Sequence, residues 1–448
     1  MSHPQDLGLR EQAAAVEAGE LDPRELLSAS LARIEERDGG LNSVVATFEE
    51  ESEQMLSGAP SGPLHGVPVG VKDMFRLPWR GPRDGSVREQ LPPGESGVYR
   101  RLRDAGAVVV GVTNMHLFGA GSTGHVSAYG PVGNPWNADH CGGGSSGGSA
   151  AAVGARLLAA AVGTDGGGSI RLPSAYCGVT GLKSTFGAIS REGYTHGYSS
   201  LGAAGPICRD AGDARLLAEV LQGRPMAAGD GSSLRAGLVQ APFWEDVDPE
   251  VEDACRAALA ATGWRVEDIE LAGAEHARAA TVLRLTLESL PEIGAEDLEE
   301  ANPLIRALVK YEALMPGHWL TRADRVRSLL RRSVAAAFER CDVLVWPTVP
   351  APAPPVEEPT VQLPSGPSPA DPPNVRQTGL GNLTGIPGVS VPAGIHSSGL
   401  PMALQLQAAW GREETLLDAA EHVERSTDRA HVDALPPIAA GTAQTKAA

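Results

Sequence analysis

Aromatic side chains are scarce in this chain of 448 residues, where Phe, Trp and Tyr together make up 4%. The core must therefore be built mainly from Leu, Val and Ala, because hydrophobic residues still account for 42% of the chain. The longest apolar runs span about ten residues and are interrupted by glycine, whereas a membrane-spanning helix needs about 20. The sequence therefore predicts a folded protein that does not cross a membrane.

Basic residues are in the minority, with 37 Lys and Arg against 55 Asp and Glu and a net charge of −18. No basic run is longer than the arginine pair at 331–332. A chain of this charge repels phosphate backbones and anionic lipid headgroups. We therefore expect neither a nucleic acid nor a membrane surface as a partner.

Cysteines with metal-binding or redox spacing are missing. The five cysteines are widely separated and form no C-x-x-C motif; they are Cys141, Cys177, Cys208, Cys255 and Cys341. This pattern is typical of reduced thiols and does not suit a zinc site. The first residues, MSHPQDLGLREQ, show no basic segment followed by an apolar one. A secretory signal is therefore not predicted, and a cytoplasmic location is expected.

Lysine is rare, since it occupies only positions 72, 183, 310 and 446 among the 37 basic residues. A lysine can lose its proton, which an arginine cannot. Lys72 follows HGVPVGV, which predicts a buried strand, and burial without a charged partner lowers the pKa of a lysine. Lys72 is therefore a candidate general base, although the preference for arginine alone is also explained by a GC-rich genome.

Predicted strands and helices alternate along the chain, which favours an α/β fold with a largely parallel sheet. Strands are expected at 41–48, 65–73, 107–114, 236–242, 266–271, 341–348, 385–395 and 401–409. Helices are expected within 9–37 and at 99–106, 149–161, 211–222, 249–262 and 413–426, with a mostly helical region at 275–341. We expect one domain over 1–434 with its core at about 60–210, a Pro-rich surface excursion at 347–373, and a disordered tail at 435–448.

Two Gly- and Ser-rich clusters, at 142–149 and 166–169, flank the apolar stretch 149–161. Ordering a run of glycines costs entropy, so such a run indicates positive φ angles or a close approach of the backbone to another group. We expect these clusters to form two loops that lie side by side. Their serines make hydroxyl chemistry the first hypothesis.

Three familiar motifs partly fit these clusters. The segment 142–147 satisfies G-x-G-x-x-G, but a dinucleotide site needs a preceding strand, which NPWNADHC does not predict. The segment 144–148 satisfies G-x-S-x-G with Ser146 as nucleophile, but the same strand is missing. The segment 181–184 lacks the frame of a phosphate-binding P-loop. Close packing explains any single glycine here, but not two Ser-Gly clusters together with an apolar lysine.

The stretch GGGSSGGSAAAVGARLLAAAVGTDGGGSIRLPSAYCGVTGLKST at 142–185 resembles the signature of the amidase signature family of serine hydrolases. The similarity continues in PLHGVPVGVKDMF, GNPWN, CDVLVWPT and GNLTGIPGVSVPAG, and so covers residues 10–425. The resemblance implies a single α/β/α domain with a central mixed, mostly parallel twisted sheet. It also implies an amidase without a metal or organic cofactor, in which the region 275–341 shapes the acyl pocket.

The family's catalytic residues fall on three positions when the motifs are matched. The resemblance places the nucleophile at Ser169, the bridging serine, which follows a cis peptide in the family, at Ser145, and the base at Lys72. A neutral, buried lysine can take a proton from Ser145 while Ser145 takes one from Ser169. This relay would make the Ser169 hydroxyl a nucleophile.

The same resemblance assigns six further residues. Gly166, Gly167 and Gly168 would direct their N–H groups at the developing oxyanion. The side chains of Ser146, Asp165 and Arg171 would support the loop. The alternative for Asp165 and Arg171 is a plain surface ion pair.

Several residues near these motifs depart from the family or stay without a role. The pair at 116–117 replaces an acidic pair of many relatives, and a lone histidine such as His116 is more often structural than catalytic. Cys141 is not expected to be catalytic, because no histidine pairs with it by a recognisable motif. The sequence does not decide which residues contact the substrate among His116, Tyr194, His196 and Tyr198.

Three functions fit these residues. The first is an amidase that hydrolyses a small-molecule amide through an acyl-enzyme on Ser169 and releases a carboxylate and ammonia or an amine. The second is a glutaminase-type subunit of an amidotransferase. The third is a catalytically idle protein or an acyl-transferring biosynthetic enzyme with an amine acceptor, and the three filled catalytic positions disfavour the idle form. The sequence does not decide the oligomeric state, and a homodimer is one option.

Overall fold

The computed structural model describes residues 3–195, 199–289, 303–312, 314–427 and 436. The helices are α1 Leu9–Glu17, α2 Pro23–Arg37, α3 Glu49–Ser57, α4 Gly97–Asp104, α5 Gly147–Gly154, α6 Arg171–Cys177, α7 Ala211–Gln222, α8 Pro249–Ala261, α9 Ala277–Ser289, α11 Pro303–Glu312, α12 His318–Ala337, α13 Asp371–Thr384 and α14 Glu413–Ser426. The strands are β1 Val44–Thr47, β2 Pro68–Lys72, β3 Val108–Thr113, β4 Ala160–Asp165, β5 Thr180–Lys183, β6 Ala203–Cys208, β7 Arg235–Leu238, β8 Arg265–Asp268, β9 Val343–Pro347, β10 Thr360–Leu363, β11 Gly366–Pro369, β12 Gly388–Ile395 and β13 Pro401–Ala408.

Eleven of these strands form one central sheet in the order β1-β3-β2-β4-β6-β5-β12-β13-β9-β7-β8. The predicted α/β class with a mixed sheet is confirmed, but the expectation that the sheet is mostly parallel is wrong. Within the described residues, parallel pairing joins β2 to β3 and β4, and β7 to β8 and β9, whereas the other neighbours are antiparallel. The connection between β12 and β13 is too short for a crossover, so these strands must pair antiparallel.

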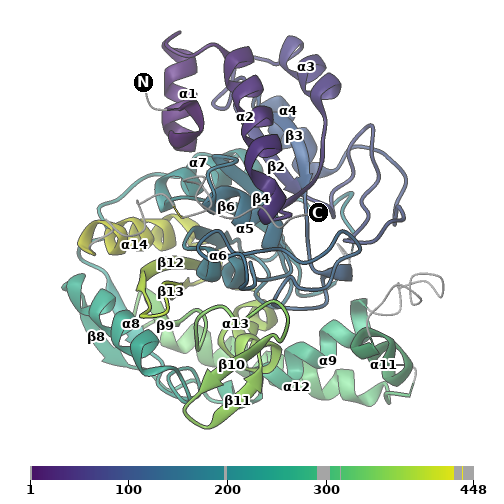
Figure 1. Cartoon of the computed structure of the whole chain (residues 1–448). Coiled ribbons are helices and arrows are strands. Elements are labelled where there is room, and N and C mark those ends of the chain that lie inside the picture. Colours follow the sequence, from purple (N-terminus) through teal and green to yellow (C-terminus); the bar gives the residue numbers. More distant parts are fainter. Residues whose placement is uncertain (1–2, 196–198, 290–302, 313, 428–435, 437–448) are drawn as a thin grey trace.

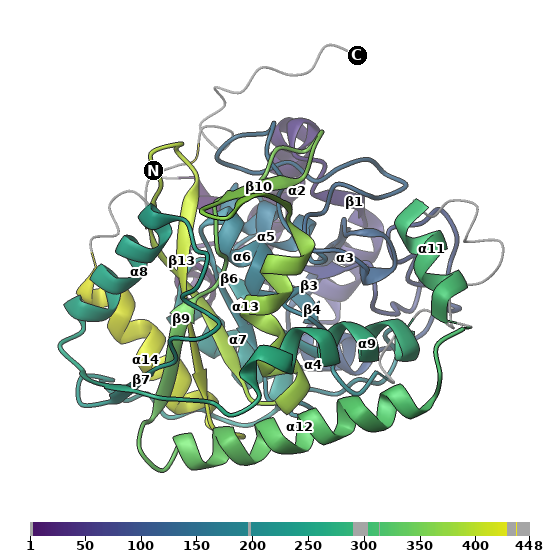
Figure 2. The same cartoon turned by 90° about the horizontal axis from the view of Figure 1, so that it is seen from below.

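Helices cover both faces of the sheet. Along one face, α4 packs against α7, α7 against α14, and α14 against α8. On the other face α5 packs against α6, and α13 packs against α6. Figure 1 shows α1 to α3 at one end of the molecule and α9, α11 and α12 at the opposite end. Figure 2 shows α9 and α12 beside α13. The region 275–341 is therefore helical in its described parts, as predicted.

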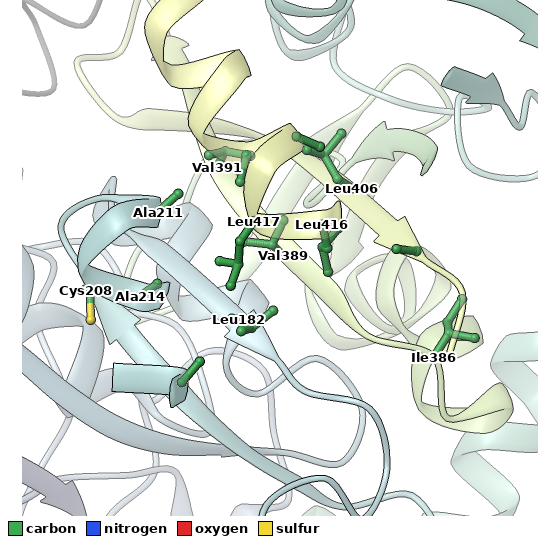
Figure 3. Close-up of a cluster of buried hydrophobic side chains, with 14 of the residues drawn as sticks. Leu182, Cys208, Ala211, Ala214, Ile386, Val389, Val391, Leu406, Leu416 and Leu417 are labelled. Atoms are coloured by element: carbon green, nitrogen blue, oxygen red, sulfur yellow. The ribbon is translucent and has the colours of Figure 1, made fainter. Parts of the chain in front are cut away.

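The largest part of the core lies between the sheet and its helical layers. Leu416 and Leu417 of α14 are fully buried over Leu182 of β5, Val389 of β12 and Leu406 of β13 (Figure 3). Each fully buried aliphatic side chain of this size stabilises the fold by about 1.5–3 kcal/mol. A core of aliphatic residues with few aromatics agrees with the composition.

Local signals explain why several helices begin where they do. The Asp22 side chain accepts hydrogen bonds from the backbone N–H groups of Arg24 and Glu25 at the start of α2, and Pro23 occupies the first helical position. Asp248 and Pro249 repeat this arrangement at α8. These helices and the parallel β7-α8-β8 unit match the predictions from the sequence.

The apolar stretch 149–161 was predicted as one helix and is instead two elements. Helix α5 ends at Gly154, Arg156 adopts a positive φ of 57°, and the chain enters β4 at Ala160. Every residue of α5 and of β4 is buried. A segment buried on all sides has no alternation of polar and apolar residues, so its sequence does not distinguish helix from strand.

The Pro-rich segment 347–373, expected to be a surface excursion, contains the hairpin of β10 and β11 and the first residues of α13. Several of its side chains are buried, among them Val349, Ala351 and Val361. The predicted tail at 435–448, apart from Pro436, and both His196 and Tyr198 lie outside the described residues. Among the described helices, none is long and apolar enough to cross a membrane.

Candidate active site

The site forms where the parallel strands β2 and β4 end. Lys72 is the last residue of β2 and Asp165 the last residue of β4. The register pairs Val71 with Val162, so Lys72 and Thr164 lie at the same edge of the sheet. The carboxyl ends of parallel strands meet at one edge, which is the usual place for ligand sites in α/β proteins.

The amine of Lys72 is completely buried and points at hydroxyl groups. Its Nζ donates hydrogen bonds to Ser145 Oγ at 2.7 Å and to Thr164 Oγ1 at 2.9 Å. Burial lowers the pKa of Lys72 to about 7, although Asp84 and Asp165 act in the opposite direction. The amine therefore exchanges between its charged and neutral forms near neutral pH and can take up a proton from Ser145.

The first Gly-Ser cluster, at 142–149, holds Ser145 beside this amine. The peptide bond between Gly144 and Ser145 is cis, as the resemblance implied, and the Ser145 carbonyl accepts a hydrogen bond from the His116 N–H at 3.0 Å. Ser146 Oγ donates to the Thr164 carbonyl at 3.1 Å. The Ser146 N–H donates to the Ser169 carbonyl at 3.1 Å, so the two Gly-Ser clusters lie side by side, as predicted.

Ser145 and Ser169 line the same cavity, which has a volume of about 340 Å³. Gly166, Gly167 and Thr164 also line it, and Ser169 itself is half-buried. The walls beyond these groups are mostly apolar and come from the loop that follows β2, from the segment after β3, and from α6, α9 and α13; they include Met74, Phe118, Leu172, Val282, Leu285 and Val375. A carbonyl compound that enters this cavity would meet both serine hydroxyls.

Asp165 and Arg171 form an ion pair beneath the second cluster, at 166–169. Both side chains are fully buried, and Arg171 Nε lies 3.0 Å from Asp165 Oδ2. The alternative of a surface ion pair is therefore wrong. Burial raises the pKa of Asp165, but the charge and hydrogen bonds of Arg171 outweigh this effect and hold that pKa well below its usual range. Asp165 is therefore ionised near neutral pH.

Helix α13 completes this buried network. Asn382 Nδ2 donates to Asp165 Oδ1 at 2.7 Å, and Arg171 Nη2 donates to Asn382 Oδ1 at 2.7 Å. Arg171 Nη1 donates to the Thr378 carbonyl at 3.0 Å, and Thr378 Oγ1 donates to the Gly167 carbonyl at 2.5 Å. The loop 166–169 is thus held from both its sheet side and its helix side.

The three glycines predicted as oxyanion-hole donors do not have equal roles. The Gly168 N–H donates to Asp165 Oδ1 at 2.8 Å, so it is not free for an oxyanion, and this part of the prediction is corrected. Gly168 has a φ of +125°, and a Cβ there would lie 2.3 Å from Thr378 Oγ1, which makes glycine necessary. Gly166 and Gly167 line the cavity, and the assignment of their N–H groups to an oxyanion hole stays a prediction.

Two residues whose contacts the sequence left open have different positions. His116 is buried and is not among the described residues that line the cavity. Its Nδ1 accepts a hydrogen bond from the Gly124 N–H at 3.2 Å. Burial lowers the pKa of His116 to about 4, so it is a neutral structural histidine. Tyr194 does line the cavity and packs edge-on against Phe75.

Sequence reasoning missed Thr164, Thr378 and Asn382. Thr164 had a local signal, because it is a hydroxyl in the otherwise apolar strand AAVGTD next to Asp165. Thr378 and Asn382 lie more than 200 residues along the chain from the loop that they support. No spacing rule connects residues so far apart, although Asn382 lies within the GNLTG segment of the family resemblance.

Comparison with known proteins shows the family to which this chain belongs. Residues 25–417 match the Amidase family, and the chain belongs to the amidase signature family. It is 35% identical over 481 aligned positions to one component of the glutamyl-tRNA(Gln) amidotransferase of Anaeromyxobacter dehalogenans (strain 2CP-C), with 94% of this chain and 96% of that protein covered. The fold and the site thus define an amidase signature hydrolase.

Solved structures give the same result. A crystal structure of an amidase has a TM-score of 0.88 and 30% identity, and covers 94% of this chain and 100% of that one. The structure of 6-aminohexanoate cyclic dimer hydrolase complexed with substrate has a TM-score of 0.85 and 26% identity, and covers 97% of this chain and 99% of that one. The proteins that resemble this chain thus carry different names.

Proposed function

We propose that this chain hydrolyses the C–N bond of a carboxylic amide through an acyl-enzyme on Ser169. The observation that carries the proposal is the 2.7 Å hydrogen bond from the buried Lys72 amine to Ser145 Oγ, at a cavity that Ser145 and Ser169 share. An amine with a pKa of about 7 is matched to general-base catalysis near neutral pH.

The acylation step uses the three groups in sequence. Neutral Lys72 takes the proton of Ser145, Ser145 takes the proton of Ser169, and Ser169 Oγ attacks the amide carbon. The carbonyl oxygen becomes an oxyanion, which the N–H groups of Gly166 and Gly167 stabilise. A well-aimed donor of this kind contributes about 3–4 kcal/mol to the transition state.

The proton then returns along the same path. Protonated Lys72 gives it back through Ser145 to the leaving nitrogen, so that ammonia or a neutral amine departs and Ser169 carries the acyl group. Water activated by the same relay attacks the ester carbon, and Ser169 is released together with a carboxylate.

A glutaminase role within an amidotransferase is the second candidate. It is supported by 35% identity across 94% of the chain to a protein whose name makes it part of such an enzyme. In that case glutamine would be the amide, and the released ammonia would pass to a partner protein. Acyl transfer to an amine is a variant of the first proposal, in which the amine replaces water.

Covalent labelling tests the assignment of the nucleophile. A fluorophosphonate reacts with an activated serine, so the wild-type chain should gain one adduct, which mass spectrometry should map to Ser169. Ser169→Ala should remove the adduct.

The matched control for this experiment is Ser199→Ala. Ser199 is another serine on the cavity wall, but it lies outside the relay, so this variant should keep the adduct. An adduct that survives in Ser169→Ala, or one that maps to Ser145 or Ser146, would contradict the proposal.

A further inference from the structure

Helix α9 presents one face to the cavity. Arg278, Val282, Leu285 and Thr286 line it, and their spacing of four, three and one residues places them on one side of a helix. Leu285 lies against the glycine loop, since a Cβ on Gly167 would meet its Cδ1 at 3.1 Å. Val282 is 42% exposed and Arg278 is exposed, so this face leads from the glycine loop to the rim of the cavity.

The guanidinium of Arg278 has no ion pair or hydrogen bond within the described part of the chain. Another arginine of the same helix contrasts with it. Arg284 pairs with Glu288 one turn later and with Asp324 of α12. The helix therefore neutralises the arginine that faces α12, whereas the one that faces the cavity has no charged partner among the residues that the structure describes.

The charges around the rim favour an anion. Arg376 of α13 lies within electrostatic range of Arg278. Burial lowers the pKa of Arg376 most, the like charge of Arg278 lowers it further, and Asp246 and Glu245 act in the opposite direction. The Nε of Arg376 is a buried donor with no partner among the described residues. Asp371 is the acidic side chain on the cavity wall, and its Oδ1 already accepts hydrogen bonds from Ser122 N–H and Oγ.

We propose that Arg278 binds a carboxylate of the amide substrate, and that an apolar spacer joins this carboxylate to the amide. This inference rests on the proposed amidase function and names its substrate class. The spacer would lie along Val282 and Leu285, two apolar side chains that offer a charge no polar partner, and the carboxylate would reach Arg278 at the rim. A guanidinium binds a carboxylate through two parallel hydrogen bonds, which gives direction as well as affinity.

The cavity volume limits the size of this substrate. A volume of about 340 Å³ is at the low end of the range of about 300–1,000 Å³ that is typical of ligand sites. A short spacer with one carboxylate therefore fits better than a peptide or a long acyl chain.

The test compares amides that differ in charge and not in shape. The first series contains monoamides of linear dicarboxylic acids with two to five methylene groups, together with neutral alkyl amides and ω-amino amides of equal length. A second series places the charge on the amine side, with hexanoyl amides of glycine and of isobutylamine. We expect the wild-type chain to favour a carboxylate probe over its neutral counterpart by about 10- to 100-fold in kcat/KM.

Arg278→Gln should remove this preference through a higher KM for the carboxylate probes, with a much smaller effect on the neutral amides. Arg278→Lys should keep part of the preference because lysine retains the charge. The matched control is Arg325→Gln, since Arg325 is exposed on α12 and is not among the cavity-lining residues. This variant should keep the full preference. High salt should weaken the preference in the wild type.

Three outcomes would overturn the carboxylate site: a wild-type preference for neutral or ω-amino probes, an equal loss on all probes in Arg278→Gln, or the same loss in Arg325→Gln. Turnover of none of the probes, with a fluorophosphonate adduct still forming on Ser169, would also overturn it and leave the proposed amidase function standing. Absence of both the adduct and any amide turnover would instead remove the amidase function itself.

Discussion

Lys72 and Lys183 are two buried lysines with different surroundings. Burial lowers the pKa of each to about 7. Lys72 donates to the hydroxyls of Ser145 and Thr164, whereas Lys183 donates to the backbone carbonyl of Ser184 at 3.1 Å. A carbonyl oxygen has no proton to give, so Lys183 cannot start the relay that we propose for Lys72.

This difference predicts the pH dependence of activity. A general base acts in its neutral form, and a pKa of about 7 means that the neutral fraction of Lys72 increases as pH rises. We expect kcat/KM to rise about tenfold per pH unit below pH 7 and to level off above about pH 8. Asp165 stays ionised throughout and adds no second transition. A pH–rate profile from about pH 5.5 to 9 measures this.

Two variants separate the lysines. Lys183→Gln should keep the rise, since glutamine can still donate to the Ser184 carbonyl. Lys72→Arg should lose about 10³-fold or more in kcat at every pH, because an arginine does not give up its proton in this range. A rise that disappears in Lys183→Gln would show that Lys183, and not Lys72, is the titrating group.

At the scale of elements, α13 connects the nucleophile loop to the rest of the site. The sequence of this segment does not favour a helix. The helix has two prolines in its first turn and contains Gly379 and Gly381, and a glycine inside a helix costs about 1 kcal/mol relative to alanine. A Cβ on Gly379 would lie 3.0 Å from Thr281 Oγ1 of α9, and one on Gly381 would lie 2.9 Å from Gln407 Nε2. Close packing therefore overrides helix propensity here.

Asn382 of α13 gives the prediction at this scale. It is fully buried and shares hydrogen bonds with Asp165 and Arg171. Asn382→Leu keeps the volume but leaves a buried ion pair short of partners, so we expect it to lower the free energy of unfolding by about 2–4 kcal/mol. Activity should fall as well, because the loop 166–169 loses a support. Urea unfolding and kcat/KM measure the two effects.

The matched control on the same helix is Thr384→Val. Thr384 is also fully buried, but its hydroxyl donates within the helix to the Leu380 carbonyl at 2.8 Å. Its loss should cost only about 1 kcal/mol and leave activity intact. Equal destabilisation in both variants would mean that Asn382 contributes through packing and not through the Asp165–Arg171 pair.

Elements with a local signal were predictable from the sequence, and their pairing was not. The caps of α2 and α8 and the apolar runs of β2, β3 and β9 mark those elements directly. Strands β5 and β6 were missed, because short runs rich in Gly and Ala carry weak strand propensity. The antiparallel strand order depends on contacts far apart in the chain, such as Gly388 with Lys183.

The candidate site divides in the same way. Lys72, Ser145 and Ser169 were reached because each lies in a contiguous motif. The hydrogen bond of the Gly168 N–H was not predicted, since it depends on the orientation of the Asp165 carboxylate. The network from α13 and the rim residue Arg278 were also out of reach, because they meet the loop only through the packing of α9 and α13.

At the scale of the whole molecule, the fold does not separate the two candidate functions. The chain aligns with 96% of a protein named as part of an amidotransferase. It also aligns, with a TM-score of 0.85, with 99% of a structure named as a cyclic dimer hydrolase. Proteins that carry different names therefore share this fold or align with this chain over nearly their whole length. The acceptor of the acyl group and any need for a partner must be measured on the intact chain.

We expect the purified chain to release ammonia or an amine from amides without any added protein, because Lys72, both serines and the glycine loop all come from this one chain. Adding hydroxylamine should divert part of the acyl-enzyme to a hydroxamate, and the total amide consumed should change little if acylation limits the rate. Size-exclusion chromatography of the active fraction would identify a monomer or a homodimer, and Ser169→Ala should give no product from water or hydroxylamine.

Activity that appears only after a cell extract is added would favour the amidotransferase role, and hydroxamate that forms without any hydrolysis would favour an acyl transferase. Steady hydrolysis by the isolated chain would leave the amidase as the function that the site performs.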